Sequence, residues 1–356
     1  MTTAWTAAHV AGIDGASLPA LPVITATDIV RVVPGFDLWD FWPVQTASGS
    51  VAVVAGGELW FALSASREGQ PESRHDRARL RLLRRDAVGW SDLGHALPDG
   101  FGPGSREWSG SAVLTDDQLT LYFTAAGRRG EAPISFEQRL FETRATLSPD
   151  GRLRDWSIPV ESVASDGRDY VVADQAEGAI GTIKAFRDPG FFRDPADGAA
   201  YLLFTASLAG SASAFNGTIG IARQDGDGWS LLPPLIHADG LNNELERPHV
   251  VVRDGRYYLF WSTQASVFAP GIDAPTGLYG MVADRLLGPY RPLNGTGLVL
   301  ANPASAPAQA YSWLVLDDLR ISSFIDAIGQ GGGFAGAPAE EGRLFVDADR
   351  TWVSSI

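Results

Sequence analysis

The chain of 356 residues contains no cysteine, so disulfide bonds and thiolate metal ligands are excluded. No apolar run approaches the roughly 20 residues of a membrane-spanning helix. Residues 1–30 do not show the basic stretch and apolar core of a secretory signal. Basic residues are outnumbered, 28 against 42 acidic ones, and the net charge of −14 is spread along the chain. This charge argues against nucleic acid or an anionic membrane as a partner and suits a neutral ligand.

Glycine and proline are abundant instead, with 40 and 22 residues, and 45% of the chain is hydrophobic. This composition is typical of a turn-rich β protein with a substantial core. The length would allow two domains, but large all-β units often form one. We expect an irregular segment at residues 1–30 that wraps around a single domain at residues 31–356.

A turn followed by an aromatic strand occurs five times. The copies begin at Gly56, Asp117, Asp197, Asp254 and Asp317, at steps of 57 to 80 residues. This spacing suits one four-stranded propeller blade with loops of variable length. The sequence therefore predicts an all-β, five-bladed propeller.

Each copy is preceded by a cluster of polar and aromatic residues: Trp39-Asp40, Trp108-Ser109, Arg187-Asp188, Glu246-Arg247 and Tyr311-Ser312. In a propeller the innermost strand of every blade lines the central channel. Equivalent positions then meet in one pocket, so three acids far apart in sequence, Asp40, Asp188 and Glu246, are expected to lie together. We predict an active site in the channel.

Two acids, Glu244 and Glu246, stand two residues apart just before a predicted strand. In an extended segment they share one face, and the adjacent Arg247 would keep one of them charged or fixed in orientation. A surface Glu-Arg pair at a strand start is the alternative for this motif alone. The similar clusters elsewhere favour a site.

Two further motifs each allow two interpretations. The tripeptide Arg-Asp-Pro occurs at Arg187–Pro189 and again at Arg193–Pro195. The first copy lies where the other blades place inward residues, so Asp188 is predicted to be functional. Asp194 opens a turn and is predicted to lie in an exposed loop.

Asp40 stands between Trp39 and Trp42, which suits sugar stacking beside a carboxylate. An aromatic core with a capping aspartate is the alternative.

Four motifs in this order resemble glycoside hydrolase family 68, the levansucrases, inulosucrases and related bacterial β-fructofuranosidases. They are Trp39–Pro43, Glu107–Ala112, Phe186–Pro189 and Glu244–Pro248. Further segments are similar to the compact Gram-negative-type members, namely Gly277–Gly280, Leu287–Asn294 and Ser323–Asp326. The resemblance covers nearly the whole chain. It implies a five-bladed propeller that acts on sucrose and fructosyl-acceptor sugars.

The resemblance also implies roles for these residues. Asp40 would be the nucleophile that attacks the fructosyl unit, Glu246 the acid/base, and Asp188 the stabiliser of the transition state. A retaining glycosidase uses such a carboxyl pair. The implied substrate contacts are Trp39, Trp108, Ser109, Arg187, Glu244, Arg247, Gln264 and Tyr311. Among these, Arg187 and Arg247 would clamp substrate and carboxylates, and Ser109 would support Asp40.

Two departures from the family pattern carry expectations. Gln264 stands where the family often has an arginine or histidine that reaches the glucose or acceptor subsite. Gram-positive members carry a calcium site, but here Asn243 and Thr182 stand where aspartates would be expected. We therefore predict no metal, no calcium dependence and no cofactor. The resemblance implies a secreted protein, although no secretory signal is visible.

Several activities fit this pattern. Fructose could pass to sugars and a growing levan, mainly to water, or to short fructo-oligosaccharides. A sugar-binding propeller without catalysis is the distant alternative. Product length, linkage and the hydrolysis-to-transfer ratio depend on acceptor loops, and the polar cluster Phe136–Arg139 has no assigned role.

Overall fold

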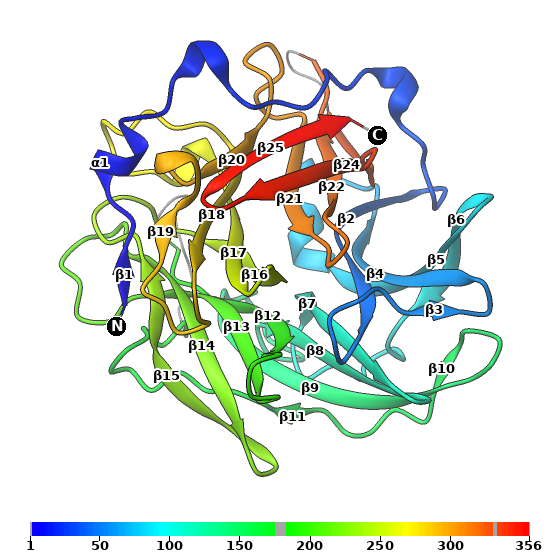
Figure 1. Ribbon diagram of the computed structural model, residues 1–356. Helices are drawn as coiled ribbons and strands as arrows, with labels where there is room; N and C mark the ends of the chain where they lie inside the picture. The colour runs from blue at the N-terminus through cyan, green and yellow to red at the C-terminus, as the bar shows by residue number, and fades with distance from the viewer. Residues whose placement is uncertain (1, 175–182, 330–332, 356) are drawn as a thin grey trace.

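The computed structural model describes residues 2–174, 183–329 and 333–355, and this part of the chain is all-β (Figure 1). Helical structure is confined to short elements: α1 (Ala7–Val10), η1 (Gly15–Ser17), η2 (Ala26–Asp28), η3 (Pro71–Arg77), η4 (Ala265–Val267) and η5 (Leu293–Gly295). In the described residues, no helix has the length and apolar character to cross a membrane.

The largest sheet has ten strands and consists of two antiparallel groups. The first group contains β2 (Phe36–Thr46), β3 (Val53–Val54), β4 (Gly57–Ser66), β5 (Arg79–Asp86) and β6 (Gly89–His95). The second contains β7 (Arg106–Thr115), β8 (Gln118–Ala126), β9 (Gln138–Leu147), β10 (Leu153–Arg154) and β11 (Val160–Glu161). A short parallel pairing of β2 with β7, from Val44–Thr46 to Ala112–Leu114, joins the two groups.

Three smaller sheets follow, each with five strands. The third group contains β12 (Phe186–Arg193), β13 (Ala200–Ser207), β14 (Gly217–Asp225) and β15 (Gly228–His237), with β1 (Thr3–Ala4) parallel to β15. The fourth contains β16 (Glu246–Arg253), β17 (Arg256–Thr263), β18 (Gly277–Ala283), β19 (Arg291–Pro292) and β20 (Leu298–Ala301). The fifth contains β21 (Ala310–Val315), β22 (Arg320–Ala327), β23 (Phe334–Pro338), β24 (Gly342–Asp347) and β25 (Arg350–Ser355).

The five predicted turn-plus-aromatic segments form β4, β8, β13, β17 and β22, the second long strand of each group. The turn before β17 shows how the sequence sets the hairpin. Asp254 and Gly255 both have left-handed backbones, with φ of 50° and 72°, and Arg253 pairs with Arg256 across them. Such a two-residue turn matches the twist of the flanking strands and favours Asp-Gly. These segments were predicted correctly.

The first strand of every group carries a one-residue bulge at the polar cluster. The pairing register shifts between Trp39 and Trp42, Trp108 and Gly110, Arg187 and Gly190, Glu246 and His249, and Tyr311 and Leu314. Four bulges contain a non-glycine residue with positive φ: Asp40 (49°), Asp188 (60°), Arg247 (52°) and Ser312 (59°). Side chains pay a conformational cost there, and bulges re-aim side chains beside functional sites. The clusters therefore share a backbone distortion as well as a position.

The N-terminal segment packs along the third and fourth groups. Trp5 is 1% exposed, and its ring lies 5.3 Å from Trp261 and 5.0 Å from Tyr279 between centroids. Ala20 forms an isolated parallel bridge with Ala301 at the end of β20. In Figure 1 the blue segment accordingly runs from β1 past α1 and along the outside of the strands.

The prediction that Asp194 lies in an exposed loop was wrong. Asp194 is only 7% exposed, and its Oδ1 accepts hydrogen bonds from the Tyr257 hydroxyl at 2.6 Å and the Ala196 amide at 2.9 Å. The turn between β12 and β13 folds against β17, so Tyr257 covers the carboxylate. The hydrogen bond from Tyr257 gives Asp194 a structural role that the local sequence did not indicate.

Candidate active site

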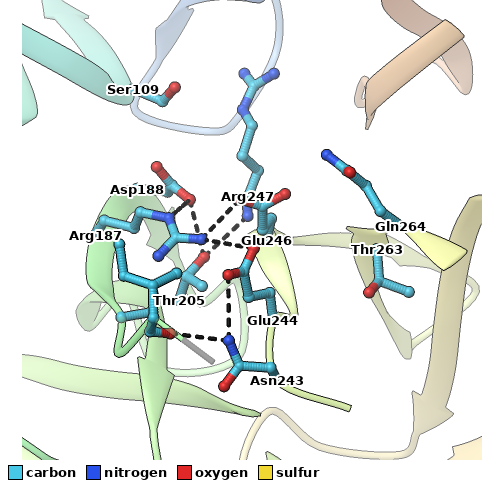
Figure 2. Close-up of polar contacts among 12 residues, drawn as sticks. Ser109, Arg187, Asp188, Thr205, Asn243, Glu244, Glu246, Arg247, Thr263 and Gln264 are labelled. Atoms are coloured by element: carbon cyan, nitrogen blue, oxygen red, sulfur yellow. Dashed lines mark hydrogen bonds and ion pairs between the residues drawn. The ribbon is translucent and has the colours of Figure 1, made fainter. Parts of the chain in front are cut away.

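The polar side chains of β2, β7, β12 and β16 meet at their bulges. Ser109 Oγ on β7 donates to Asp40 Oδ2 on β2 at 2.5 Å. The Arg187 guanidinium on β12 lies 2.8 Å from Glu246 Oε1 and 3.7 Å from Asp188 Oδ2 (Figure 2). Asp40 lies close enough to Asp188 for its charge to act on that carboxyl, so the structure brings the three predicted carboxylates into one polar cluster.

Asp188 is held on both its side chain and its backbone. Thr205 Oγ1 on β13 donates to Asp188 Oδ2 at 3.0 Å, and the Asp188 amide donates to Thr124 Oγ1 on β8 at 2.9 Å. Burial raises the pKa of Asp188; Arg187 opposes the shift, and the nearby charges of Glu246 and Asp40 add to it. A buried carboxylate in this setting is strongly oriented and costly to ionise.

Arg187 contacts more of the acidic side chains in the cluster than any other described residue. Its Nη2 also lies 3.1 Å from Glu244 Oε2, so one guanidinium serves two carboxylates of the Glu244–Glu246 pair. Gln138 Oε1 accepts from Arg187 Nη1 at 3.3 Å and from the Phe186 amide at 3.1 Å. The cluster Phe136–Arg139, which had no assigned role, therefore supplies the amide that orients Arg187.

Glu244 is buried behind Arg187. Asn243 Nδ2 donates to Glu244 Oε1 at 3.2 Å, and the Glu244 amide donates to Asn242 Oδ1 at 2.8 Å. Burial raises the pKa of Glu244; Arg187 lowers it, and the charge of Glu246 raises it further. Glu246 accepts an additional hydrogen bond from the Tyr311 hydroxyl on β21. Tyr311 thus joins the cluster at the carboxyl expected to act as acid/base.

Arg247 makes different contacts from the expected carboxylate clamp. Its Nη1 donates to Ser312 Oγ at 2.7 Å and to the Ser312 carbonyl at 3.2 Å, and its Nη2 donates to the Phe41 carbonyl at 2.8 Å. The positive φ at Arg247 lies in the bulge, where the side chain turns toward β21 and β2. Arg187 makes the carboxylate contacts, whereas Arg247 ties the backbones of the first and fifth groups together.

The tryptophans lie beside an imidazole that the sequence did not single out. Trp39 is 1% exposed, its ring centroid lies 5.5 Å from that of His75, and its Nε1 has no hydrogen-bond partner among the described residues. Trp108 Nε1 donates to the His75 carbonyl at 3.3 Å. Burial lowers the pKa of His75 to about 3, aided by Arg74 and opposed by Asp40. His75 is therefore a neutral group at neutral pH.

Gln264 follows the end of β17 and accepts a hydrogen bond from Ser266 Oγ at 3.3 Å. Figure 2 shows it on the side of Glu246 and Arg247 away from Arg187. Its expected contact with a sugar stays a prediction. Of the two positions compared with calcium ligands, Asn243 bonds Glu244, and Thr182 lies outside the described residues. Within the described ranges, no group of three or more His, Asp or Glu side chains could hold a metal ion.

Comparison with known proteins decides the family. The family model described as Levansucrase/Invertase, glycoside hydrolase family 68, matches residues 1–216 and 210–353. The chain belongs to glycoside hydrolase family 68. The family 68 resemblance carried by the four motifs is thereby confirmed.

Individual relatives agree with this assignment. Levansucrase LscA of Pseudomonas savastanoi pv. glycinea is 31% identical over 95% of this chain and 89% of its own length. The levansucrase of Zymomonas mobilis is 34% identical over 82% of this chain and 75% of its own. Among solved structures, an inulosucrase from Halalkalicoccus jeotgali bound to kestose is 39% identical, with a TM-score of 0.92 over 100% of this chain and 96% of that one.

Proposed function

We propose that this family 68 protein transfers fructosyl units from sucrose with retention, through a covalent fructosyl-enzyme. Glucose is released, and fructose passes to sugars, to a growing levan and to water. Support comes from family membership and from levansucrases and an inulosucrase among the similar proteins. The observation that carries the proposal is that Asp188 and Glu246 both contact Arg187, while Asp40 lies close enough to Asp188 for its charge to raise the pKa of that carboxyl.

In the first step, Asp40 attacks the anomeric carbon of the fructosyl unit, and the bond from that carbon to the glucosyl oxygen breaks. Glu246 gives its proton to the departing oxygen, so glucose leaves neutral. The Ser109 hydroxyl at 2.5 Å fixes the attacking carboxylate. In the second step, Glu246 takes a proton from water or a sugar hydroxyl, whose oxygen displaces Asp40.

Asp188 serves the transition state. The fructosyl ring gains positive charge as its bond to glucose lengthens, and an oriented carboxylate favours that charge. Thr205 and Thr124 hold Asp188 in place, so no reorganisation is needed during the reaction. Arg187 fixes Glu244 and Glu246 relative to Asp188.

We further propose that the five strand groups are five blades of one propeller domain, residues 31–356, with residues 1–30 wrapped around it. Three facts support this arrangement: each group carries its bulge on its first strand, β2 pairs with β7, and Arg247 ties the first and fifth groups together. The active site then lies in the central channel. We also propose that the enzyme works outside the cell, as the family resemblance implies.

Incubating the protein with sucrose and measuring both monosaccharides tests this function. Transfer gives more free glucose than free fructose, because part of the fructose enters longer products. Equal amounts would indicate the hydrolytic alternative, which the neutral amide of Gln264 favours because an amide holds an acceptor sugar less strongly than a charged group. A sugar-binding propeller would release no glucose, and that result would overturn the proposal.

A further inference from the structure

Lys184 is the single lysine of the chain. It directly precedes Ala185 and the first residues of β12, two positions past the end of the undescribed segment. Its Nζ donates to the Ala214 carbonyl at 2.6 Å and to Asn216 Oδ1 at 2.5 Å, and lies 3.5 Å from Asn243 Oδ1. One ammonium thus gathers three oxygens from two segments that are far apart in the sequence.

The amides around this ammonium lead directly to the catalytic cluster. Asn243 Nδ2 donates to the Ile183 carbonyl at 2.8 Å and to Glu244 Oε1 at 3.2 Å. Because the ammonium faces the Asn243 oxygen, it fixes which end of the amide points toward Glu244. Asn216 is fixed in the same way, since its Nδ2 donates to the Leu208 carbonyl at 2.7 Å.

The backbone of Lys184 supports the other side of the same cluster. Its carbonyl accepts from Gln138 Nε2 at 2.9 Å, and Gln138 Oε1 accepts from Arg187 Nη1 at 3.3 Å. Arg187 and Glu244 form an ion pair at 3.1 Å. Lys184 therefore supports both members of that pair. Its carbonyl contacts Arg187 through Gln138, and its ammonium contacts Glu244 through Asn243.

The charge of the ammonium also bears on Glu244. Burial lowers the pKa of Lys184, and the nearby Glu244 carboxylate opposes that shift. Arg187, Asp188 and Glu246 are the other charged groups that act on Glu244. Two of those three are acids, so a second cation near Glu244 favours its ionised form.

We infer that Lys184 is a positioning residue of the active site, a partly buried cation that holds Asn243 so that its amide fixes Glu244 and, through Glu244, Arg187. This inference rests on the proposed fructosyl transfer. Lys184 does not touch the reacting atoms, and its effect reaches them through Glu244. Loss of the ammonium removes the contact that holds the Asn243 amide oxygen and makes Glu244 harder to ionise.

The test compares Lys184→Met, which keeps the length of the side chain, with Lys184→Arg and with Arg223→Met. Arg223 is an exposed cation on β14 of the same group, so its loss changes the net charge equally. We expect Lys184→Met to lower kcat/KM for sucrose by roughly tenfold to a hundredfold, the scale of a misplaced catalytic group. The acidic limb of the pH profile should move to higher pH by about half a unit or more.

The matched variants separate a positioning role from a structural one. Lys184→Arg should return the acidic limb toward its original position, and Arg223→Met should leave rate and profile unchanged. A Lys184→Met enzyme with the wild-type rate and pH profile overturns the inference. A wild-type enzyme that releases no glucose from sucrose overturns the proposed function instead, so the two failures are distinguishable.

A second measurement keeps the inference testable if Lys184→Met does not fold. Acetylation with an N-hydroxysuccinimide ester can modify a lysine side chain at Lys184 alone, and peptide mass spectrometry gives the modified fraction. Acetylation removes the charge from the folded protein. We expect activity to fall in proportion to the fraction of Lys184 acetylated. Full activity at complete modification, with an unchanged circular dichroism spectrum, would overturn the inference.

Discussion

Ser109 and Asp40 are joined across two strand groups by a hydrogen bond of 2.5 Å from the serine hydroxyl to Asp40 Oδ2. Asp40 has a φ of 49° within the bulge of β2, so its carboxylate depends on such a contact for orientation. Ser109 comes from β7, and β2 and β7 pair in parallel only a few residues further along. The carboxylate that we propose as nucleophile is therefore positioned at the junction between two groups.

Replacing Ser109 with alanine should lower kcat for sucrose by roughly tenfold to a hundredfold while KM changes little, because the bond orients the attacking carboxylate. Ser111 is the matched control on the same strand. Its hydroxyl donates to the Pro189 carbonyl at 2.8 Å and accepts from the Phe191 amide at 2.9 Å. Ser111→Ala should lower the melting temperature, while kcat should change little. Equal kcat in wild type and Ser109→Ala would rule out this role.

The two Arg-Asp-Pro copies should respond differently to loss of the carboxylate. Asp188→Ala should nearly abolish kcat, since its contacts act in the transition state. Asp194→Ala should leave kcat within a few-fold of wild type but destabilise the fold, because Tyr257 would lose a buried partner. Steady-state kinetics and thermal unfolding separate the two effects. An inactive, fully stable Asp194→Ala protein would show that the wrong copy was chosen.

The raised pKa of Asp188 predicts how stability changes with pH. Because burial raises the pKa in the folded state, the unfolded chain ionises first, and the stability that Asp188 contributes at low pH is lost as pH rises through the folded-state pKa. Asp188→Asn removes this loss. The folded-state pKa of about 6 lies about two units above the ordinary value of 3.8. Each pKa unit corresponds to about 1.4 kcal/mol, so a stabilisation of up to about 3 kcal/mol is expected at pH 8 and almost none at pH 3.

Urea unfolding of the wild type and Asp188→Asn at the two pH values measures this difference. The same variant should be nearly inactive, so the charged Asp188 would be retained at a cost in stability. A variant that is less stable than wild type at pH 8 would mean that Arg187 favours the charged carboxylate more than burial opposes it.

Gln264 should influence the choice of acceptor. A cationic side chain there would bind a sugar hydroxyl more strongly than an amide, by about 1 kcal/mol. Water and sugar compete for one fructosyl-enzyme, so Gln264→Arg and Gln264→His should increase the glucose-to-fructose ratio and lengthen products. Sucrose cleavage should change only modestly. Unchanged ratios and product lengths in both variants would place acceptor selection elsewhere.

Much of the fold was predictable because its signals are local. A turn followed by an aromatic strand specifies a hairpin within about ten residues, and the chain has five such signals, two of them with an Asp-Gly turn. The bulges were not predictable, because a left-handed φ at Asp40 or Asp188 is imposed by pairing with the neighbouring strand. The side-chain direction of Arg247 depends on a hydrogen bond to Ser312, which is distant in sequence, so it was not predictable either.

Some residues of the site had a sequence signal that was overlooked. Two aromatic strands contain the pair Phe-Thr, at Phe123-Thr124 and Phe204-Thr205. In both, the threonine hydroxyl accepts the amide of the bulge residue in the next group, Asp188 at 2.9 Å and Arg247 at 3.1 Å. The repeated hydroxyl could have indicated these partners. His75 lies in an arginine-rich stretch, residues 67–85, and had no such signal.

The central claim, that Asp40 is the nucleophile of fructosyl transfer from sucrose, is tested most directly by comparing Asp40→Asn with Asp37→Asn. Asp37 lies on the same strand but is paired with Arg31 and Arg67. Glucose release from sucrose should fall at least ~10³-fold in Asp40→Asn, with the fold intact, as for loss of a covalent catalyst, and should stay near wild type in Asp37→Asn. Activity of Asp40→Asn within tenfold of wild type, with Asp37→Asn inactive, would contradict the claim and move the nucleophile to Asp37.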